Sequence, residues 1–179
     1  MLACIGWIGL ACQAPETRVP DPRPPAVTLD GVPSPGRPTS LLARFRNRGD
    51  APVWWNARAL LNRPHAPAAF RELWLDVAAD DGTEVPFNCK VNTGEASVDD
   101  YELLAPGATH DVAVNLEHCH DLARGGRFRV VLHYRDGTPS PPRAPAGALA
   151  LTAELVSAPL TLDLPLPAPA PGRRPIDGS

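Results

Sequence analysis

The chain lacks a long apolar run, an excess of basic charge and a sustained helical pattern. The apolar stretch at residues 2–11 is too short to span a bilayer. Basic and acidic residues are interspersed and the formal net charge is −3, so the charge pattern gives no sign of a nucleic-acid-binding surface. No window repeats apolar residues with a period of 3.6 between helix caps, and 23 prolines and 14 glycines interrupt the chain. Long helices are therefore not expected.

The motifs of the common enzyme classes are also missing. The sequence contains no H-E-x-x-H, no G-x-S-x-G, no phosphate-binding loop and no G-x-G-x-x-G. Two carboxylate pairs, Asp80-Asp81 and Asp99-Asp100, lie in turn sequences, where aspartate commonly accepts hydrogen bonds from backbone N–H groups. We therefore predict a protein that is not an enzyme and that needs no cofactor.

Two runs in the second half of the chain alternate apolar and polar residues, as half-buried strands do. Residues 109–116 place Val112, Val114 and Leu116 on one face. Residues 127–135 have an apolar face made of Phe128, Val130, Leu132 and Tyr134. Pro106-Gly107, which precedes the first run, predicts a type II turn. We expect the two runs to pair in an antiparallel sheet.

Shorter strand-like runs, separated by proline and glycine, fill most of the remaining chain. They are residues 26–30, 41–46, 53–61, 70–78, 84–88 and 149–164, the last interrupted near Ala158-Pro159. The pattern predicts one all-β domain over residues 26–165, an Ig-like antiparallel β-sandwich of about seven to nine strands. The proline-rich segment 166–179 is predicted to be a disordered tail.

The first 12 residues resemble an export signal. Residues 2–11 fit its apolar core, and Leu10-Ala11-Cys12 resembles the processing box of a bacterial lipoprotein, in which the cysteine is lipidated. A plain secretory signal is the alternative. Residues 13–25 are rich in proline and predict an extended linker. We expect an exported protein, either secreted or held in the cell envelope, with a lipid on Cys12 as its one link to a membrane.

Cys89 and Cys119 are expected to form a disulfide. They are the cysteines left for pairing if Cys12 is lipidated and the residues before it are removed. An exported domain with one such pair usually bridges it. Closing a loop of about 30 residues contributes about 3–4 kcal/mol on the chain-entropy model. The alternative is that these cysteines are reactive or serve as thiolate metal ligands.

Histidines around Cys119 are candidate metal ligands. The set is His110, His118, His120 and His133, with Glu117 and Asp121 beside the middle pair. Imidazole and carboxylate groups suit copper or zinc. In an extended segment, His118 and His120 point to one face, as chelation by two histidines requires. Solvated loop histidines are the alternative, and a disulfide at Cys119 would remove its thiolate.

Two tryptophans are candidates for an exposed aromatic binding surface. Trp54 and Trp55 are adjacent, so in a strand one enters the core and the other faces outward. Trp55 together with Trp74 is the candidate surface pair, which would suit a protein partner or a glycan. Core packing is the alternative.

A longer set of residues resembles a known family. The similar positions are V-P-F at 85–87, Lys90, D-D-Y-x-x-L-A-P-G at 99–107, V-x-L at 114–116, D-L at 121–122, G-x-F-x-V at 126–130 and Tyr134. This pattern is similar to the β-sandwich segment that precedes the catalytic domain of deuterolysin-like (aspzincin) metallopeptidases. Cys119 stands where that family usually has tyrosine. The resemblance covers residues 41–134 and implies an Ig-like exported fold, without the protease activity.

These features predict a non-enzymatic, exported or lipid-anchored β-sandwich that binds another protein in the cell envelope. One alternative, suggested by the resemblance, is an inhibitor or pro-segment-like regulator, with a metallopeptidase as the partner. A second is a copper- or zinc-binding envelope protein, which rests on the four histidines. A third, glycan binding, rests on Trp55 and Trp74. No nucleic-acid partner is expected.

Overall fold

The computed structural model describes residues 26–67, 71–90 and 94–166 of the chain. The predicted signal with Cys12, the proline-rich linker and the tail beyond residue 166 lie outside these residues. The described part is almost entirely β-structure, and the predicted all-β antiparallel sandwich is confirmed. No helix in these three segments is long and apolar enough to cross a membrane.

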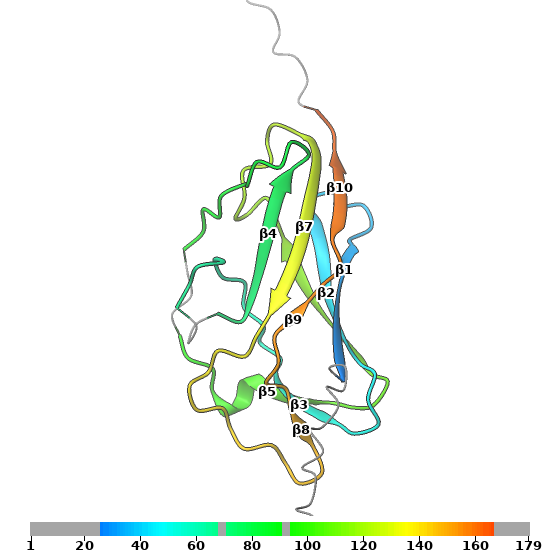
Figure 1. Cartoon of the computed structure of the whole chain (residues 1–179), viewed down its shortest axis with the longest axis vertical. Coiled ribbons are helices and arrows are strands. Elements are labelled where there is room, and N and C mark those ends of the chain that lie inside the picture. Colours follow the sequence, from blue (N-terminus) through cyan, green and yellow to red (C-terminus); the bar gives the residue numbers. More distant parts are fainter. Residues whose placement is uncertain (1–25, 68–70, 91–93, 167–179) are drawn as a thin grey trace, which may run out of the picture.

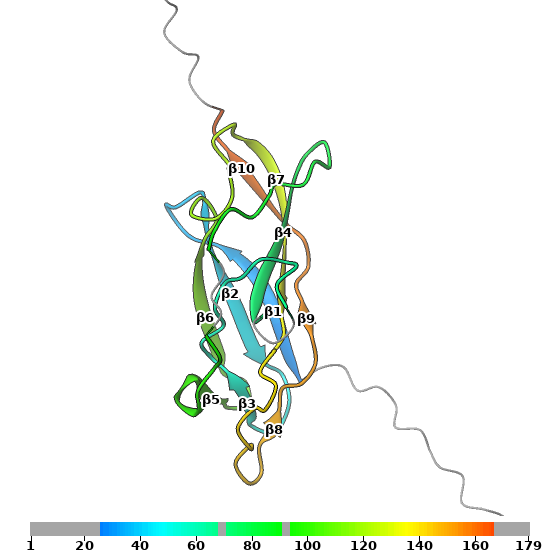
Figure 2. The same ribbon diagram turned by 90° about the vertical axis from the view of Figure 1, so that its left-hand side faces the viewer.

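Two larger sheets face each other, and a smaller sheet closes one end of the molecule (Figures 1 and 2). The first sheet contains, in spatial order, β1 (Val27–Pro33), β2 (Ser40–Asn47) and β6 (Thr109–Asn115). The second contains β10 (Leu160–Leu164), β7 (Gly126–Tyr134) and β4 (Leu73–Ala79), and the short β9 (Leu155–Val156) also pairs with β7.

The end sheet is built from short strands. In spatial order these are β5 (Tyr101–Leu104), β3 (Val53–Asn56) and β8 (Leu149–Ala150). The 3-10 helix η2 (Val98–Asp100) leads directly into β5. The β3–β8 pair is parallel, whereas the other strand pairs of the described chain are antiparallel.

The core lies between the two larger sheets, and the period-two patterns correctly predict which side chains enter it. All four predicted inward residues of β7 are buried: Phe128, Val130, Leu132 and Tyr134. On β4 the buried alternating residues are Leu73, Leu75 and Val77. Val114 and Leu116, at the end of β6, are buried from the opposite side. Burying each such side chain stabilises the fold by roughly 1.5–3 kcal/mol before the cost in chain entropy.

Three aromatic rings, one from each sheet, meet in the core. The ring centroid of Phe45 on β2 lies 4.5 Å from that of Trp55 on β3 and 5.0 Å from that of Tyr134 on β7. The ring centroids of Trp55 and Tyr134 are 5.6 Å apart with an interplanar angle of 65°, an edge-to-face arrangement that the ring quadrupoles favour. The Tyr134 hydroxyl donates to the Asn56 carbonyl at 2.9 Å, and burial raises the pKa of this phenol well above its ordinary value.

β2 and β6 turn a corner and continue as β3 and β5. Gly107 has a φ of 73° and the Ala108 N–H donates to the Ala105 carbonyl at 3.0 Å, as expected for the predicted turn. Gly107 and Ala108 both bond to the backbone of Asn47, through Gly107 N–H to Asn47 C=O (2.9 Å) and Asn47 N–H to Ala108 C=O (3.1 Å). Two residues opposite one make a β-bulge, which bends the strand pair.

The buried side chain of Asn47 satisfies three backbone groups at this corner. Its Nδ2 donates to the Ala51 carbonyl at 2.8 Å and to the Leu104 carbonyl at 2.9 Å. Its Oδ1 accepts the Gly49 N–H at 2.9 Å. The residue is 0% exposed, and its bond to the Leu104 carbonyl is buried, so that carbonyl has no water to bond to if the amide is lost.

The predicted pairing of the two runs at 109–116 and 127–135 is wrong. β6 pairs with β2 and β7 pairs with β4 and β10, so the two strands lie in opposite sheets. The connection between them crosses from one sheet to the other, with Leu116 and Leu122 buried at its ends. Each strand has one apolar face. Two such strands can cover the core from opposite sheets, as here, or side by side in one sheet, and the alternation of residues is the same in both cases.

Several predicted strand boundaries also differ from the structure. The run at 53–61 ends at Asn56, and Ala59 has a positive φ of 39°, which a continuing strand cannot accommodate. The run at 84–88 makes only isolated bridges, from Glu84 to Ala78 and from Phe87 to His120. The predicted strand at 149–164 is three short strands, and β5 was not predicted. β4 begins at Leu73, later than predicted.

Replacing Asn47 with alanine should lower the free energy of unfolding by about 3 kcal/mol, because two carbonyls and one N–H lose the buried amide that pairs with them. Asn47→Asp should also destabilise the protein, since a carboxylate cannot donate to the Ala51 and Leu104 carbonyls. Urea unfolding measures both. Asn115→Ala, at an exposed position of β6, should change stability by less than about 0.5 kcal/mol. Equal effects at Asn47 and Asn115 would contradict the role of the corner.

Candidate functional site

The predicted disulfide between Cys89 and Cys119 is confirmed. The two Cα atoms are 4.8 Å apart. The bridge joins the segment that follows the β4 hairpin to the connection between β6 and β7. Backbone contacts flank it, because Asn88 N–H donates to Cys119 C=O at 2.7 Å and Phe87 pairs with His120. These contacts point to a structural role for the bridge, which holds the crossover between the sheets in place.

The four candidate metal-binding histidines do not come together, so the predicted four-histidine site is wrong. His110 lies on β6, where its ring packs 5.1 Å from Trp55, whereas His133 lies on β7 in the other sheet. Across the described segments, one group of three or more possible ligands lies close together: Cys89, His118 and Cys119. Both sulfurs of that group are in the disulfide, so neither provides a thiolate.

His120 is a buried histidine beside the disulfide. Its side chain is 4% exposed, and its Nδ1 lies 3.1 Å from the Val85 carbonyl. Its Nε2 has no hydrogen-bond partner in the described chain. The neutral tautomer with the proton on Nδ1 can donate to Val85, whereas a second proton on Nε2 would be unpaired and desolvated. Burial accordingly lowers the pKa of His120 below its ordinary value.

The predicted exposed pair of tryptophans is also wrong, because Trp55 is 1% and Trp74 is 5% exposed. Trp55 is the residue of the adjacent pair that enters the core. Trp74 points outward from β4 but is covered by His133, whose ring stacks at 5.1 Å, and by the Arg71 guanidinium at 5.0 Å. Trp54 donates from Nε1 to the Pro142 carbonyl. A glycan surface built on Trp55 and Trp74 therefore has no exposed rings to offer.

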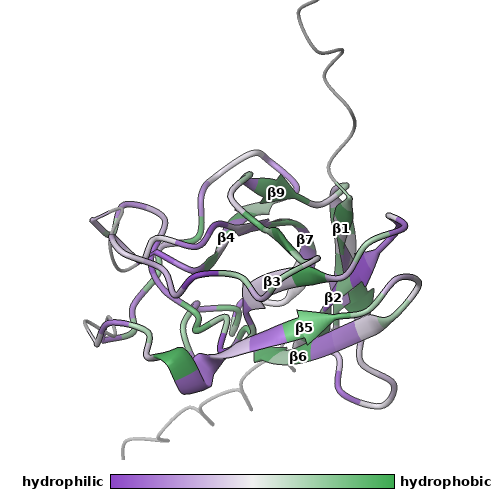
Figure 3. Cartoon of the chain, turned by 90° about the horizontal axis from the view of Figure 1, so that it is seen from below, coloured by the Kyte–Doolittle hydropathy of each residue, from purple (hydrophilic) through white to green (hydrophobic). Residues whose placement is uncertain are grey.

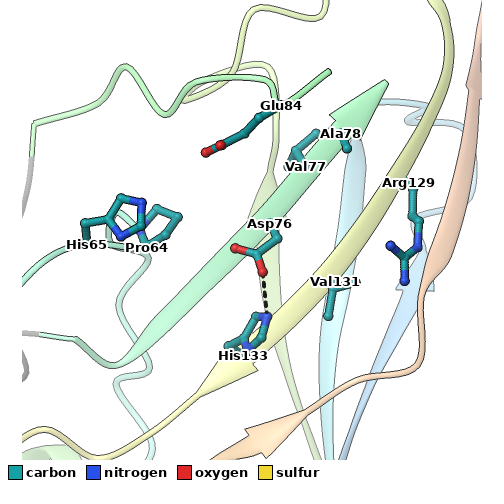
Figure 4. Close-up of a pocket in the computed structure, with 9 residues that line it drawn as sticks. All are labelled: Pro64, His65, Asp76, Val77, Ala78, Glu84, Arg129, Val131 and His133. Carbon is teal, nitrogen blue, oxygen red and sulfur yellow. Dashed lines mark hydrogen bonds and ion pairs between the residues drawn. The ribbon is translucent and has the colours of Figure 1, made fainter. Parts of the chain in front are cut away.

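A shallow pocket of about 440 Å³ lies on the outer face of β4 and β7 (Figure 4). Asp76 points toward His133, with Oδ2 3.0 Å from Nε2, while Nδ1 of the same ring lies 3.4 Å from Oε1 of Glu154. His65 and Glu84 reach the pocket from the loops that precede and follow β4 in the sequence. The His133 ring is thus oriented by one hydrogen-bonding contact with Asp76 and by stacking on Trp74, while the Glu154 carboxylate lies near its Nδ1, which has no hydrogen-bond partner in the described chain. An oriented histidine can act as a base, but among the described residues no hydroxyl or thiol side chain lines this pocket.

An open strand edge runs along the other side of the molecule, at β6. Leu116 N–H donates to Thr39 C=O, and Asn47 N–H donates to Ala108 C=O. Because these bonds alternate along an antiparallel pair, the even-numbered residues of β6 turn their backbone groups toward β2. The N–H and C=O groups that point to the open edge belong to Thr109, Asp111, Ala113 and Asn115. No strand of the described chain pairs with this edge. β5 continues it past the corner, and Figure 3 shows the two strands along one side of the molecule.

The other outer strands are less available. The edge of β4 is covered by bonds from Ala79 N–H to Thr83 C=O and from Val85 N–H to Val77 C=O, both 2.8 Å. β10 is bounded by Pro159 and Pro165, and prolines next to a strand discourage further pairing. β1 packs against β7, β9 and β10. β6 has seven residues, no proline and no lysine, so it is the long edge that remains open.

Reduction of the disulfide should lower the melting temperature by roughly 10 °C, because opening a loop of about 30 residues removes about 3–4 kcal/mol of stabilisation on the chain-entropy model. Cys89→Ser should melt near the temperature of the reduced protein and should not respond to reductant. Thermal unfolding with and without a phosphine reductant tests both statements. A melting temperature that is the same in both conditions would show that the bridge does not stabilise the fold.

The buried His120 predicts a loss of stability in mild acid. Its folded-state pKa lies below the ordinary value of 6.5, so the unfolded chain binds more protons as the pH falls through that value, and the free energy of unfolding decreases. His120→Gln, which cannot gain a proton, should show a shallower decrease between pH 7 and pH 5 than the unchanged protein. Urea unfolding at several pH values measures the two slopes, and parallel curves would contradict the prediction.

The open edge of β6 and the pocket beside His133 are thus two surfaces of the described chain that a ligand or partner can reach. The first offers unpaired backbone groups, and the second offers a histidine already held by neighbours. The similarity to the metallopeptidase segment over residues 41–134 stays a prediction. No protein-family model matches the chain, and no curated protein sequence matches it either.

Proposed function

We propose that this protein is an exported, non-enzymatic binding module that recognises another protein in the cell envelope. The observation that carries the proposal is the open edge of β6, which is continued by β5. An extended segment of a partner pairs with such an edge by main-chain hydrogen bonds, and side chains next to the edge set its specificity. Sheets that do not use an exposed edge usually protect it.

The side chains of β6 favour the approach of an added strand. Thr109, Asp111, Ala113 and Asn115 are exposed, and these residues also turn their N–H and C=O groups outward. Ala113 in the middle has a small side chain, which leaves room for a neighbouring strand. Asp111 is bound by Arg44 on β2, so its charge is compensated and repels an added strand less.

The predicted N-terminal region agrees with this function. An anchor at Cys12 followed by the proline-rich linker at 13–25 would hold the sandwich at a distance from a membrane. Both lie outside the described residues, so this part of the proposal rests on the sequence. A metallopeptidase is a candidate partner because of the resemblance over residues 41–134.

Ala113→Pro should weaken partner binding at least about tenfold, because it removes an outward N–H and places a ring at the edge. Ala113→Ser keeps the N–H and should bind normally. Neither change touches a bond to β2, so both variants should fold. Cross-linked capture from the native envelope, read by mass spectrometry, identifies proteins lost with Ala113→Pro and retained with Ala113→Ser.

Hydrogen exchange provides a second test. In the free protein the amides of Thr109, Asp111, Ala113 and Asn115 should exchange faster than those of the intervening residues, and binding should protect them selectively. A captured protein that remains bound to Ala113→Pro would rule out the edge as the contact. If Ala113→Pro instead converts a dimer to a monomer in sedimentation, the edge binds a second copy and the proposal fails. A metallopeptidase among the edge-dependent partners would identify the protein as a regulator.

A further inference from the structure

The outer face of the first sheet arranges its charged side chains in rows that run across the strands. The register aligns Asp30 of β1, Arg44 of β2 and Asp111 of β6. One step further along, it aligns Thr28 of β1, Arg46 of β2 and Thr109 of β6. Residues directly opposite one another in a sheet point to the same face, so each row presents three neighbouring side chains to solvent.

The first row contains enough negative charge to compensate its arginine. Arg44 donates from Nε to Asp111 Oδ1 at 2.9 Å and from Nη2 to Oδ2 at 2.8 Å, which is a two-point contact. These hydrogen bonds hold the pKa of Asp111 below its ordinary value and raise that of Arg44. Asp30 lies on the other side of Arg44. Arg44 therefore has little capacity left for an external anion.

The arginine of the second row has no carboxylate directly opposite it, because Asp30 and Asp111 stand in the adjacent row. Arg46 is flanked by the hydroxyl groups of Thr28 and Thr109, and it makes no ion pair within 4.0 Å in the part of the chain that the structure describes. Arg48 turns to the same face, because its Nε donates to Thr28 Oγ1 at 3.3 Å. It likewise has no acidic partner within that distance. Both arginines are exposed.

A hollow connects these groups. It has a volume of about 690 Å³, and Arg46, Arg48 and Thr109 line one part of it, while Arg44 with the carboxylates Asp30 and Asp111 lines the other. Two guanidinium groups present planar sets of N–H donors that match the oxygens of carboxylate or phosphate, and a threonine hydroxyl can donate one more bond. If these arginines had a purely structural role, their guanidinium groups would bond to acceptors within the fold. In the described chain the one such acceptor is the Thr28 hydroxyl, which accepts a hydrogen bond from Arg48.

We propose that Arg46, Arg48, Thr28 and Thr109 form a binding site for an oxyanion, the carboxylate or phosphate group of a ligand. The site lies on the face of the sheet rather than on its edge, so it does not depend on the proposed pairing at β6. The ligand is either a free anion or an acidic group carried by a partner, and the two sources share the same contacts with the arginines.

The test is a titration of the ¹⁵N-labelled protein, followed through the Nε–Hε signals of its arginines at constant low ionic strength. The probes are inorganic phosphate and a tetraglutamate peptide with blocked ends, and sodium chloride is the comparison salt. We expect saturable shifts of the Arg46 and Arg48 signals. Arg46→Gln and Arg48→Gln should each weaken binding about tenfold, because each removes a charge-assisted contact.

Arg37→Gln is the matched control, since Arg37 is an exposed arginine in the turn at the far end of the β1–β2 hairpin. It makes the same change in net charge and should bind as the unchanged protein does. Arg48→Lys keeps the charge but loses the planar donor set, so it should weaken binding as well. Saturation by phosphate alone indicates a free phosphate-type ligand, and saturation by the peptide alone indicates an acidic segment of a partner.

Three results would overturn the proposal. The first is that neither probe shifts the Arg46 and Arg48 signals beyond the change produced by chloride. The second is that Arg37→Gln weakens binding as much as Arg46→Gln, which would mean a diffuse effect of net charge. The third is that Arg46→Gln and Arg48→Gln, each shown to be folded by its melting temperature, bind both probes normally.

Discussion

The amide of Asn47 fixes the point at which a strand pair leaves one sheet and enters another. β2 and β6 run side by side up to this residue, and their continuations, β3 and β5, belong to the end sheet. The bulge at Gly107 and Ala108 bends the pair, and the side chain of Asn47 satisfies the backbone groups that the bend exposes. The direction of β3 in turn brings Trp55 to Phe45 and Tyr134. The hydrogen bonds of the Asn47 side chain thus fix the end of the sandwich, and through β3 they also position Trp55, the largest ring of the core.

The exposed surfaces depend on the same strand pair. β6 pairs with β2 through its even-numbered residues, so its odd-numbered residues carry both the outward backbone groups and the side chains of the outer face. Thr109 therefore belongs to the open edge and to the arginine face at once. The two proposed contacts are chemically different, since one uses peptide hydrogen bonds and the other uses guanidinium groups. A partner with an extended, acidic segment would satisfy both.

Local sequence patterns predict what a strand buries better than they predict what it pairs with. The inward faces of β4, β6 and β7 and the turn at Pro106-Gly107 follow from periodicity and turn chemistry, and the disulfide follows from the cysteine count in a chain predicted to be exported. The placement of β6 and β7 in different sheets could not be predicted from periodicity, because a strand with one apolar face can cover either side of the core. Trp74 is covered by Arg71 and His133, which lies far along the chain, and no local pattern reveals such a cover. The candidate metal set failed for the same reason, since it assumed that His110 and His133 lay on paired strands.

The two ends of the described chain leave from opposite ends of the sandwich, one below β1 and the other above β10 (Figure 1). Tension between residue 26 and residue 166 would therefore run along the long axis of the molecule. β1 would be pulled lengthwise against β2, with which it is paired from Val27 to Pro33. In that direction the bonds of the ladder lie across the line of force and share the load, rather than opening one after another. The fold is suited to transmit a mechanical pull while its side edge remains free.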